Sequence, residues 1–161
     1  MEIERGEDST TASVIVKKIV NADRERVFEA WTNPEMMQHW FVGAKGRAQV
    51  AVDLRVGGEY SNEMFIEGKG TCQEEGPPSG RYLHHGKYLE IIRPERLVFS
   101  WNSPFVQNTT VTVELREVES GTEVTITHQL NAPSECEGHR GGWTYALGSL
   151  GDFLSGGVDL G

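Results

Sequence analysis

His128 and Tyr60 are the side chains of this sequence whose type and position could support acid-base chemistry. His128 alternates with Val124 and Ile126 in a strand-like run, so it should point inward with these apolar residues. An imidazole or a phenol that faces a bound molecule can exchange a proton with it. A buried imidazole also needs a hydrogen-bond partner, so a histidine that is simply satisfied within the core is the other interpretation of His128.

The remaining reactive side chains do not form a recognisable motif. The five histidines are His39, His84, His85, His128 and His139. None of them is spaced from another histidine, a cysteine or a carboxylate as a metal ligand set requires, and the adjacent His84 and His85 would face opposite sides of a strand. No serine lies in a nucleophile-elbow sequence, and Gly57-Gly58 lacks the rest of a phosphate-binding loop. The sequence therefore predicts neither a metal site nor a cofactor.

Large apolar and aromatic side chains with a few polar tips recur along the strand-like runs and near the C-terminus. This mixture is typical of a pocket for a small molecule. An interlocked core uses the same residue types, and the sequence leaves both interpretations open for each residue. The candidate pocket residues are Trp40, Tyr60, Met64, Tyr88, Phe99, Trp101, His128, Trp143 and Leu147.

Strands and two short helices must position these side chains. The β-branched run at 13–20 predicts a first strand, and Asp23 can begin a helix that ends at Asn33-Pro34. Pro34 can then open a second short helix that leads to Trp40. Strand patterns alternate with turn signals further along, without a long helix between them, and predict an antiparallel meander. Its expected strands are 49–54, 59–65, 87–93, 96–101, 111–115 and 124–130.

The segment 139–154 predicts one long closing helix. Trp143, Leu147, Leu150 and Leu154 step by four, three and four positions, so they form a single apolar stripe. Such a stripe must pack on another element, and the sheet is the natural partner. Gly148 and Gly151 lower the stability of this helix by about 1 kcal/mol each relative to alanine.

Size and composition indicate one domain. With 161 residues, of which 37% are hydrophobic, the chain suits a single core, which we place at 13–155 between flexible tails at 1–12 and 156–161. The segment 67–82 is rich in glycine and charge and predicts a surface loop without regular structure.

Charge and targeting signals narrow the partners and the compartment. The formal net charge of -9 opposes binding to nucleic acid. No run approaches the length of a membrane span, and the acidic N-terminus lacks the apolar centre of a signal peptide. We therefore expect a cytoplasmic protein in which Cys72 and Cys136 are free thiols.

Short phrases along the chain resemble those of a known family. The order of elements is similar to the helix-grip fold of the START-like (SRPBCC) superfamily. The phrases at 22–35, 56–60, 92–97 and 141–143, together with Trp40, resemble the stand-alone family related to the activator of the heat-shock protein 90 ATPase. The resemblance covers about residues 13–155, although the segment 68–82 is longer than this family usually carries.

The resemblance implies an α+β, helix-grip fold. A curved antiparallel β-sheet would wrap around a long C-terminal α-helix, with two short helices after the first strand. Such folds often leave an apolar cavity between the sheet and the helix. The cavity is where the resemblance implies a binding site.

Three functions stay open. The stripe of large residues beneath the closing helix favours a protein that binds a small apolar or amphipathic molecule without catalysis. The first alternative is an enzyme that acts on a cyclic or aromatic compound in the same cavity, because related START-like domains include cyclases and hydrolases. The second alternative, regulation of a heat-shock ATPase, rests on the family name alone.

The oligomeric state also stays open. An uncovered edge strand near Val50 or Tyr60 could pair across a homodimer. Charges at Asp53, Arg55 and Glu59 could equally guard that edge against pairing.

Overall fold

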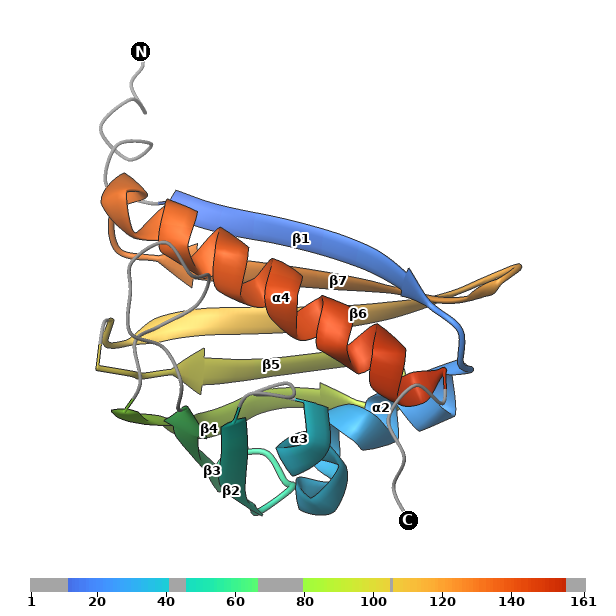
Figure 1. Cartoon of the computed structure of the whole chain (residues 1–161), viewed down its shortest axis with the longest axis horizontal. Helices are drawn as coiled ribbons and strands as arrows, with labels where there is room; N and C mark the ends of the chain where they lie inside the picture. The colour runs from blue at the N-terminus through green and yellow to red at the C-terminus, as the bar shows by residue number, and fades with distance from the viewer. Residues whose placement is uncertain (1–11, 41–45, 67–79, 105, 156–161) are drawn as a thin grey trace.

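A seven-stranded antiparallel sheet curves around one long helix in the computed structural model (Figure 1). The structure describes residues 12–40, 46–66, 80–104 and 106–155. The strands are β1 (Ala12–Val20), β2 (Gly46–Val52), β3 (Glu59–Ile66), β4 (Gly80–Ile92), β5 (Arg96–Trp101), β6 (Thr109–Val118) and β7 (Gly121–Leu130). The helices are α2 (Arg24–Thr32), α3 (Pro34–Trp40), the short 3-10 helix η2 (Pro133–Glu135) and α4 (Cys136–Leu154). The α+β helix-grip prediction is confirmed.

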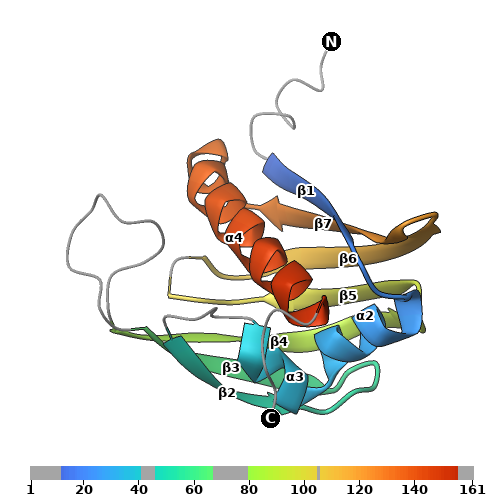
Figure 2. The ribbon, with the colours of Figure 1, turned by 45° about the vertical axis from the view of Figure 1, so that its right-hand side comes forward.

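The strand order is β1-β7-β6-β5-β4-β3-β2, so the first strand pairs with the last. Helix α4 crosses one face of this sheet diagonally, and α2 and α3 lie near the C-terminal end of α4 (Figure 2). We call the face that carries α4 the inner face and the opposite one the outer face. Each strand buries alternate side chains on the inner face, as Leu97, Phe99 and Trp101 show in β5.

Side-chain caps begin the two short helices α2 and α3 at the predicted residues. The Asp23 carboxylate accepts a hydrogen bond from the Arg26 amide at 2.9 Å and caps α2. The Asn33 side chain accepts from the Glu35 amide at 2.9 Å, where α3 begins with Pro34. These caps satisfy amides that a helix N-terminus leaves without partners.

Several element boundaries differ from the sequence prediction, and those of β4 and α4 bear on the site. Strand β4 begins at Gly80 rather than at 87, because its first half pairs in register with β3. The predicted loop 67–82 is therefore too long at its C-terminal end, and 67–79 lie outside the described residues. Helix α4 begins at Cys136, three residues before the predicted start at 139.

The sequence analysis predicted an edge strand near Val50 or Tyr60, and the structure confirms this position for Val50 but not for Tyr60. Val50 lies on β2, which is an edge strand, whereas Tyr60 lies on β3 between β2 and β4. Only long-range pairing could reveal this difference, because both segments have strand-like sequences. Pairing of two copies through β2 stays a prediction.

Candidate functional site

His128 lies on the inner face with both ring nitrogens hydrogen-bonded inside the protein. The Trp143 indole N–H donates to His128 Nδ1 at 3.0 Å, and because an indole nitrogen can only donate, Nδ1 carries no proton. The Nε2–H then donates to Thr109 Oγ1 at 2.9 Å, and the Thr109 hydroxyl donates to the Trp101 carbonyl at 2.8 Å. Burial, with a smaller effect from neighbouring histidines, lowers the pKa of His128 to about 3. The ring is therefore neutral at pH 7, in agreement with this tautomer.

A line of rings crosses the inner face beneath α4. The ring of Trp101 lies 4.3 Å from His84 of β4 and 5.2 Å from Trp143 of α4, measured between centroids. His128 meets Trp101 edge-on at 5.6 Å. We call His84, Trp101, His128 and Trp143 the aromatic run. It places flat ring surfaces between the sheet and the helix, where planar groups can stack.

Asn62 lies at the β3 end of the aromatic run. It pairs with His84 of β4 and with Val50 of β2, and its side chain is fully buried. Among the residues that the structure describes, neither Nδ2 nor Oδ1 of its amide has a hydrogen-bond partner. Leaving such a group unsatisfied costs about 1–3 kcal/mol. Most buried polar groups in proteins are paired, so this amide requires a physical explanation.

His84 makes the same end of the aromatic run polar without making it charged. Its side chain is buried next to Asn62 on the inner face, while His85 is exposed on the outer face, as the alternation predicted. Burial lowers the pKa of His84 to about 3, and His139 and His85 contribute to the shift. The imidazole is neutral at pH 7.

Tyr60, Tyr88 and Phe99 form a second group of rings on the inner face. The centroid of Tyr60 lies 5.6 Å from Tyr88 and 5.3 Å from Phe99. The Tyr60 hydroxyl donates to the Ser100 carbonyl at 2.7 Å. Burial raises the pKa of both tyrosines, so both phenols are neutral. The Tyr60 proton is thus already used in a hydrogen bond to the backbone.

Because Gly86 of β4 has no side chain, the Tyr60 side chain of β3 can extend across β4 to the Ser100 carbonyl of β5. Gly86 pairs with Tyr60, and a Cβ at Gly86 would lie 2.0 Å from the Ser100 carbonyl oxygen. The Lys87 amide donates to Ser100 Oγ at 2.9 Å instead of to a backbone carbonyl. Side chains therefore complete the hydrogen bonding between β4 and β5 at this point.

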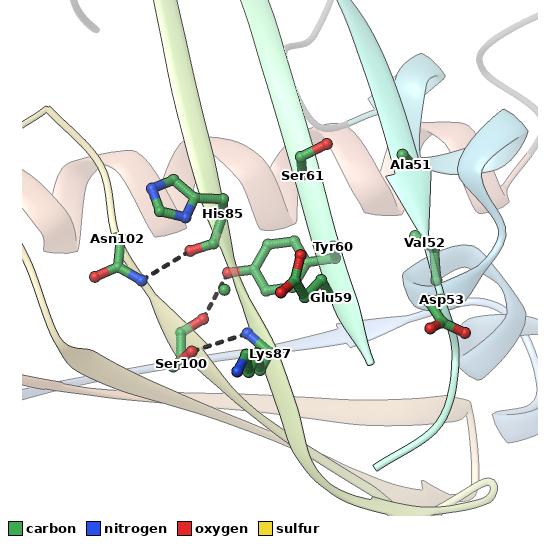
Figure 3. A pocket seen from close by; sticks show the side chains of 11 residues that line it. Ala51, Val52, Asp53, Glu59, Tyr60, Ser61, His85, Lys87, Ser100 and Asn102 are labelled. Carbon is green, nitrogen blue, oxygen red and sulfur yellow. Dashed lines mark hydrogen bonds between the residues drawn. The ribbon is translucent and has the colours of Figure 1, made fainter. Parts of the chain in front are cut away.

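A hollow of about 550 Å³ lies over this irregularity (Figure 3). Most of its lining side chains are on the outer face of β2 to β5, because they alternate with the buried inner residues. Its lining residues are Ala51, Val52, Asp53, Glu59, Tyr60, Ser61, His85, Gly86, Lys87, Ser100 and Asn102. Tyr60 is the one predicted pocket residue among them. This hollow has a mixed polar and apolar lining and lies on the face opposite to the one that the sequence analysis indicated.

Three further predicted pocket residues, Trp40, Met64 and Leu147, lie in different parts of the structure. Trp40 is fully buried and donates its indole N–H to the Ala30 carbonyl at 2.9 Å, within the packing of the two short helices. Met64 packs with Ala48 in a small cluster apart from the main core. Leu147 lies in the main core on the buried side of α4. A ligand-binding role for the nine predicted pocket residues stays a prediction.

The sequence analysis missed Asn62 and Thr109, although their spacing could have revealed both. Asn62 alternates with Tyr60 and Met64 within the predicted strand 59–65. Thr109 lies two residues before Val111, in phase with the buried side chains of β6. Asn62 lies within the predicted strand 59–65, whereas Thr109 precedes the predicted strand 111–115, because β6 begins two residues earlier than its apolar pattern indicates.

The described residues contain no group of three or more His, Cys, Asp or Glu side chains that could hold a metal ion. Cys136 is a free thiol at the start of α4, whereas Cys72 lies outside the described residues. No described helix is both long and apolar enough to cross a membrane.

Comparison with known proteins identifies a family. Residues 21–155 match the family described as Activator of Hsp90 ATPase homolog 1-like protein. No curated protein matches the chain.

Solved structures share the fold at low sequence identity. The AHSA1-like protein from Aeromonas hydrophila is 19% identical with a TM-score of 0.75, and the match covers 91% of this chain and 94% of that one. Protein CV1439 from Chromobacterium violaceum is 20% identical with a TM-score of 0.74, over 88% of this chain and 96% of its own. Protein Ms6760 from Mycobacterium smegmatis is 17% identical with a TM-score of 0.75, over 94% of each chain.

Proposed function

The chain belongs to the Activator of Hsp90 ATPase homolog 1-like protein family, and from this premise we propose that it binds a small apolar or amphipathic molecule between the inner face of the sheet and α4. The observation that carries the proposal is the aromatic run beneath α4. Its rings present flat apolar surfaces, and a few polar atoms lie among them, as in pockets that orient small molecules.

Helix α4 is built in a way that would let it move from the sheet. A Cβ at Gly138, Gly141, Gly142 or Gly148 would meet nothing within 4 Å, so packing does not require glycine at these positions. Each glycine lowers helix stability by about 1 kcal/mol relative to alanine. A helix with this composition supports entry of a ligand beneath it.

A pair of tryptophan substitutions on α4 tests the proposal. Ala146 is the smallest side chain of the buried stripe, and its neighbour Tyr145 is about half exposed, at 48%. We expect Ala146→Trp to fill the space beneath the helix and abolish binding, while Tyr145→Trp adds the same side chain on the solvent side and preserves binding. The measurement is a thermal-shift screen against acyl, sterol, aromatic and cyclic compounds.

The size of the expected signal follows from mass action. A ligand at 100 times its dissociation constant adds about 2.7 kcal/mol to the free energy of unfolding. A shift that survives in folded Ala146→Trp protein would place the ligand elsewhere. The outer hollow would then be the next site to test.

The geometry favours binding over catalysis in this site. Both nitrogens of His128 and the hydroxyl of Tyr60 are held in hydrogen bonds within the protein, so proton transfer to a ligand would first require one of these bonds to break. Turnover of a bound cyclic compound that is lost in His128→Ala would reverse this preference. Regulation of a chaperone ATPase is tested separately, by direct titration with Hsp90.

A further inference from the structure

We propose that Asn62 selects the ligand, by pairing with a neutral head group that presents a hydrogen-bond donor beside an acceptor, as a primary carboxamide or a lactam does. This inference rests on the proposed function and names the ligand class for the same site. Its starting point is the buried Asn62 amide, which has no hydrogen-bond partner among the described residues.

The Asn62 amide matches such a head group atom for atom. Its Oδ1 can accept a hydrogen bond from an N–H and its Nδ2 can donate one to a carbonyl, and neither atom has a partner in the described part of the chain. Two such bonds to one amide form a reciprocal pair, which fixes the orientation of the ligand. A binding site built for a polar group rejects analogues that lack it, because its own buried atoms are then left unpaired.

The surroundings of Asn62 favour a neutral head group over an ion. The adjoining His84 is neutral, since burial lowers its pKa to about 3, and Val50 on the other side is apolar. Within the described aromatic run, His128 is the other ionisable group, and burial lowers its pKa in the same way. His139, whose ring lies 4.9 Å from that of His128, acts electrostatically on both histidines, but no cationic side chain pairs with Asn62 on either neighbouring strand. A carboxylate at Asn62 would therefore be a buried charge without a directly paired cation, which is unfavourable.

The rest of the aromatic run favours a flat ligand body. Directly opposed side chains on neighbouring antiparallel strands have Cβ atoms about 5 Å apart, and Asn62 opposes His84 in this way. From His84 the rings continue to Trp101 at 4.3 Å and on to Trp143 of α4 at 5.2 Å. A planar aromatic body attached to a carboxamide would place its polar end at Asn62 and its rings beneath α4.

Three matched naphthalene probes test the inference by calorimetric titration. 2-Naphthamide carries the complementary head group, 2-naphthoate replaces it with a charge, and 2-methylnaphthalene removes it. We expect the wild-type protein to bind the amide at least about ten-fold more tightly than the other two, which corresponds to about 1.4 kcal/mol. In Asn62→Leu, which has nearly the same shape, the amide should bind no better than the hydrocarbon.

Thr122→Val provides the matched control. Thr122 is equally buried on the sheet, but its hydroxyl donates to the Ala22 carbonyl at 2.7 Å. This variant should keep the preference for the amide and lose stability. Asn62→Leu should instead raise Tm by about 2–4 °C without any probe, because it removes an unsatisfied amide. Asn62→Val serves the same purpose if the leucine does not fit.

Each negative result of these experiments leads to a different conclusion. If the probes bind but the amide is not preferred, or if folded Asn62→Leu keeps the preference, the role of Asn62 is overturned while the proposed function stands. A fall in Tm for both Asn62 variants would show that ordered water satisfies the amide, which also overturns the inference. If none of the three probes binds the wild-type protein while the thermal-shift screen finds another ligand that Ala146→Trp abolishes, the carboxamide inference is overturned and the proposed function stands.

Discussion

Two fully buried polar side chains on the inner face, His128 and Asn62, differ in how their hydrogen bonds are satisfied. The His128 nitrogens are hydrogen-bonded to Trp143 and Thr109, whereas the Asn62 amide has no partner within residues 12–40, 46–66, 80–104 and 106–155. A satisfied buried group stabilises the folded state, while an unsatisfied one opposes it unless something else binds there. At this scale His128 belongs to the architecture, and Asn62 is the residue available to a ligand.

Thr109→Val tests the architectural role of the His128 hydrogen bonds. The substitution removes the acceptor for His128 Nε2–H, and we expect the free energy of unfolding to fall by about 1–3 kcal/mol. Urea unfolding measures this change. Thr110→Val is the control, because Thr110 is only half-buried and should change stability by no more than about 0.5 kcal/mol. Equal effects of the two substitutions would mean that the bond to His128 contributes nothing specific.

Glycines act differently in the two elements that enclose the site. In α4 most of them face open space, so they weaken the helix without serving its packing. In β4, Gly86 allows the Ser100 carbonyl to approach the backbone of β4 closely, and this carbonyl accepts a hydrogen bond from the Tyr60 hydroxyl. Packing of the sheet thus requires its glycine at 86, whereas packing of α4 does not require most of its own.

Alanine substitutions separate these two uses of glycine. Gly142→Ala and Gly148→Ala should each raise the free energy of unfolding by about 1 kcal/mol, because alanine favours the helix and meets no neighbour. Gly86→Ala should lower it by about 1–3 kcal/mol, because its Cβ would collide with backbone. Denaturant titrations measure all three. Destabilisation by both α4 substitutions would contradict the view that these glycines are unconstrained.

The whole molecule combines a formal net charge of -9 with a core that contains neutral histidines. Burial lowers the pKa values of His84 and His128 to about 3, below the value near 6.5 that the unfolded chain would have. Between these values the unfolded state binds more protons than the folded state. The stability from these groups is therefore present above pH 6.5 and is lost as the pH falls toward 3.

Acid unfolding measures this linkage. We expect the free energy of unfolding to fall between pH 6.5 and 5 by as much as about 1.4 kcal/mol per pH unit for each of the two histidines. In this range most carboxylates remain ionised. His84→Leu should reduce the slope by about half, because one of the two buried histidines is then absent. A wild-type slope near zero would show that neither histidine stays neutral in the folded protein.

Local patterns in the sequence determined the fold class and most of its elements. Alternation with period two marks the strands, the Asp23 cap and Pro34 mark the short helices, and the stripe at Trp143, Leu147 and Leu150 marks α4. These signals could be read because each depends on residues within a few positions of one another. The inward direction of His128 and the opposite faces of His84 and His85 followed from the same period.

Only the tertiary structure decided what those inward side chains do. The partners of His128 lie 15 and 19 positions away, and the Tyr60 hydroxyl meets a carbonyl 40 positions away. Pairing with β3 likewise decided where β4 begins and that Tyr60 is not on an edge strand. A residue type shows that a polar group needs a partner, but whether it finds one depends on strands brought together from distant parts of the chain. This is why the sequence indicated His128 as a candidate for chemistry, whereas the described fold satisfies His128 and offers Asn62 no partner among its residues.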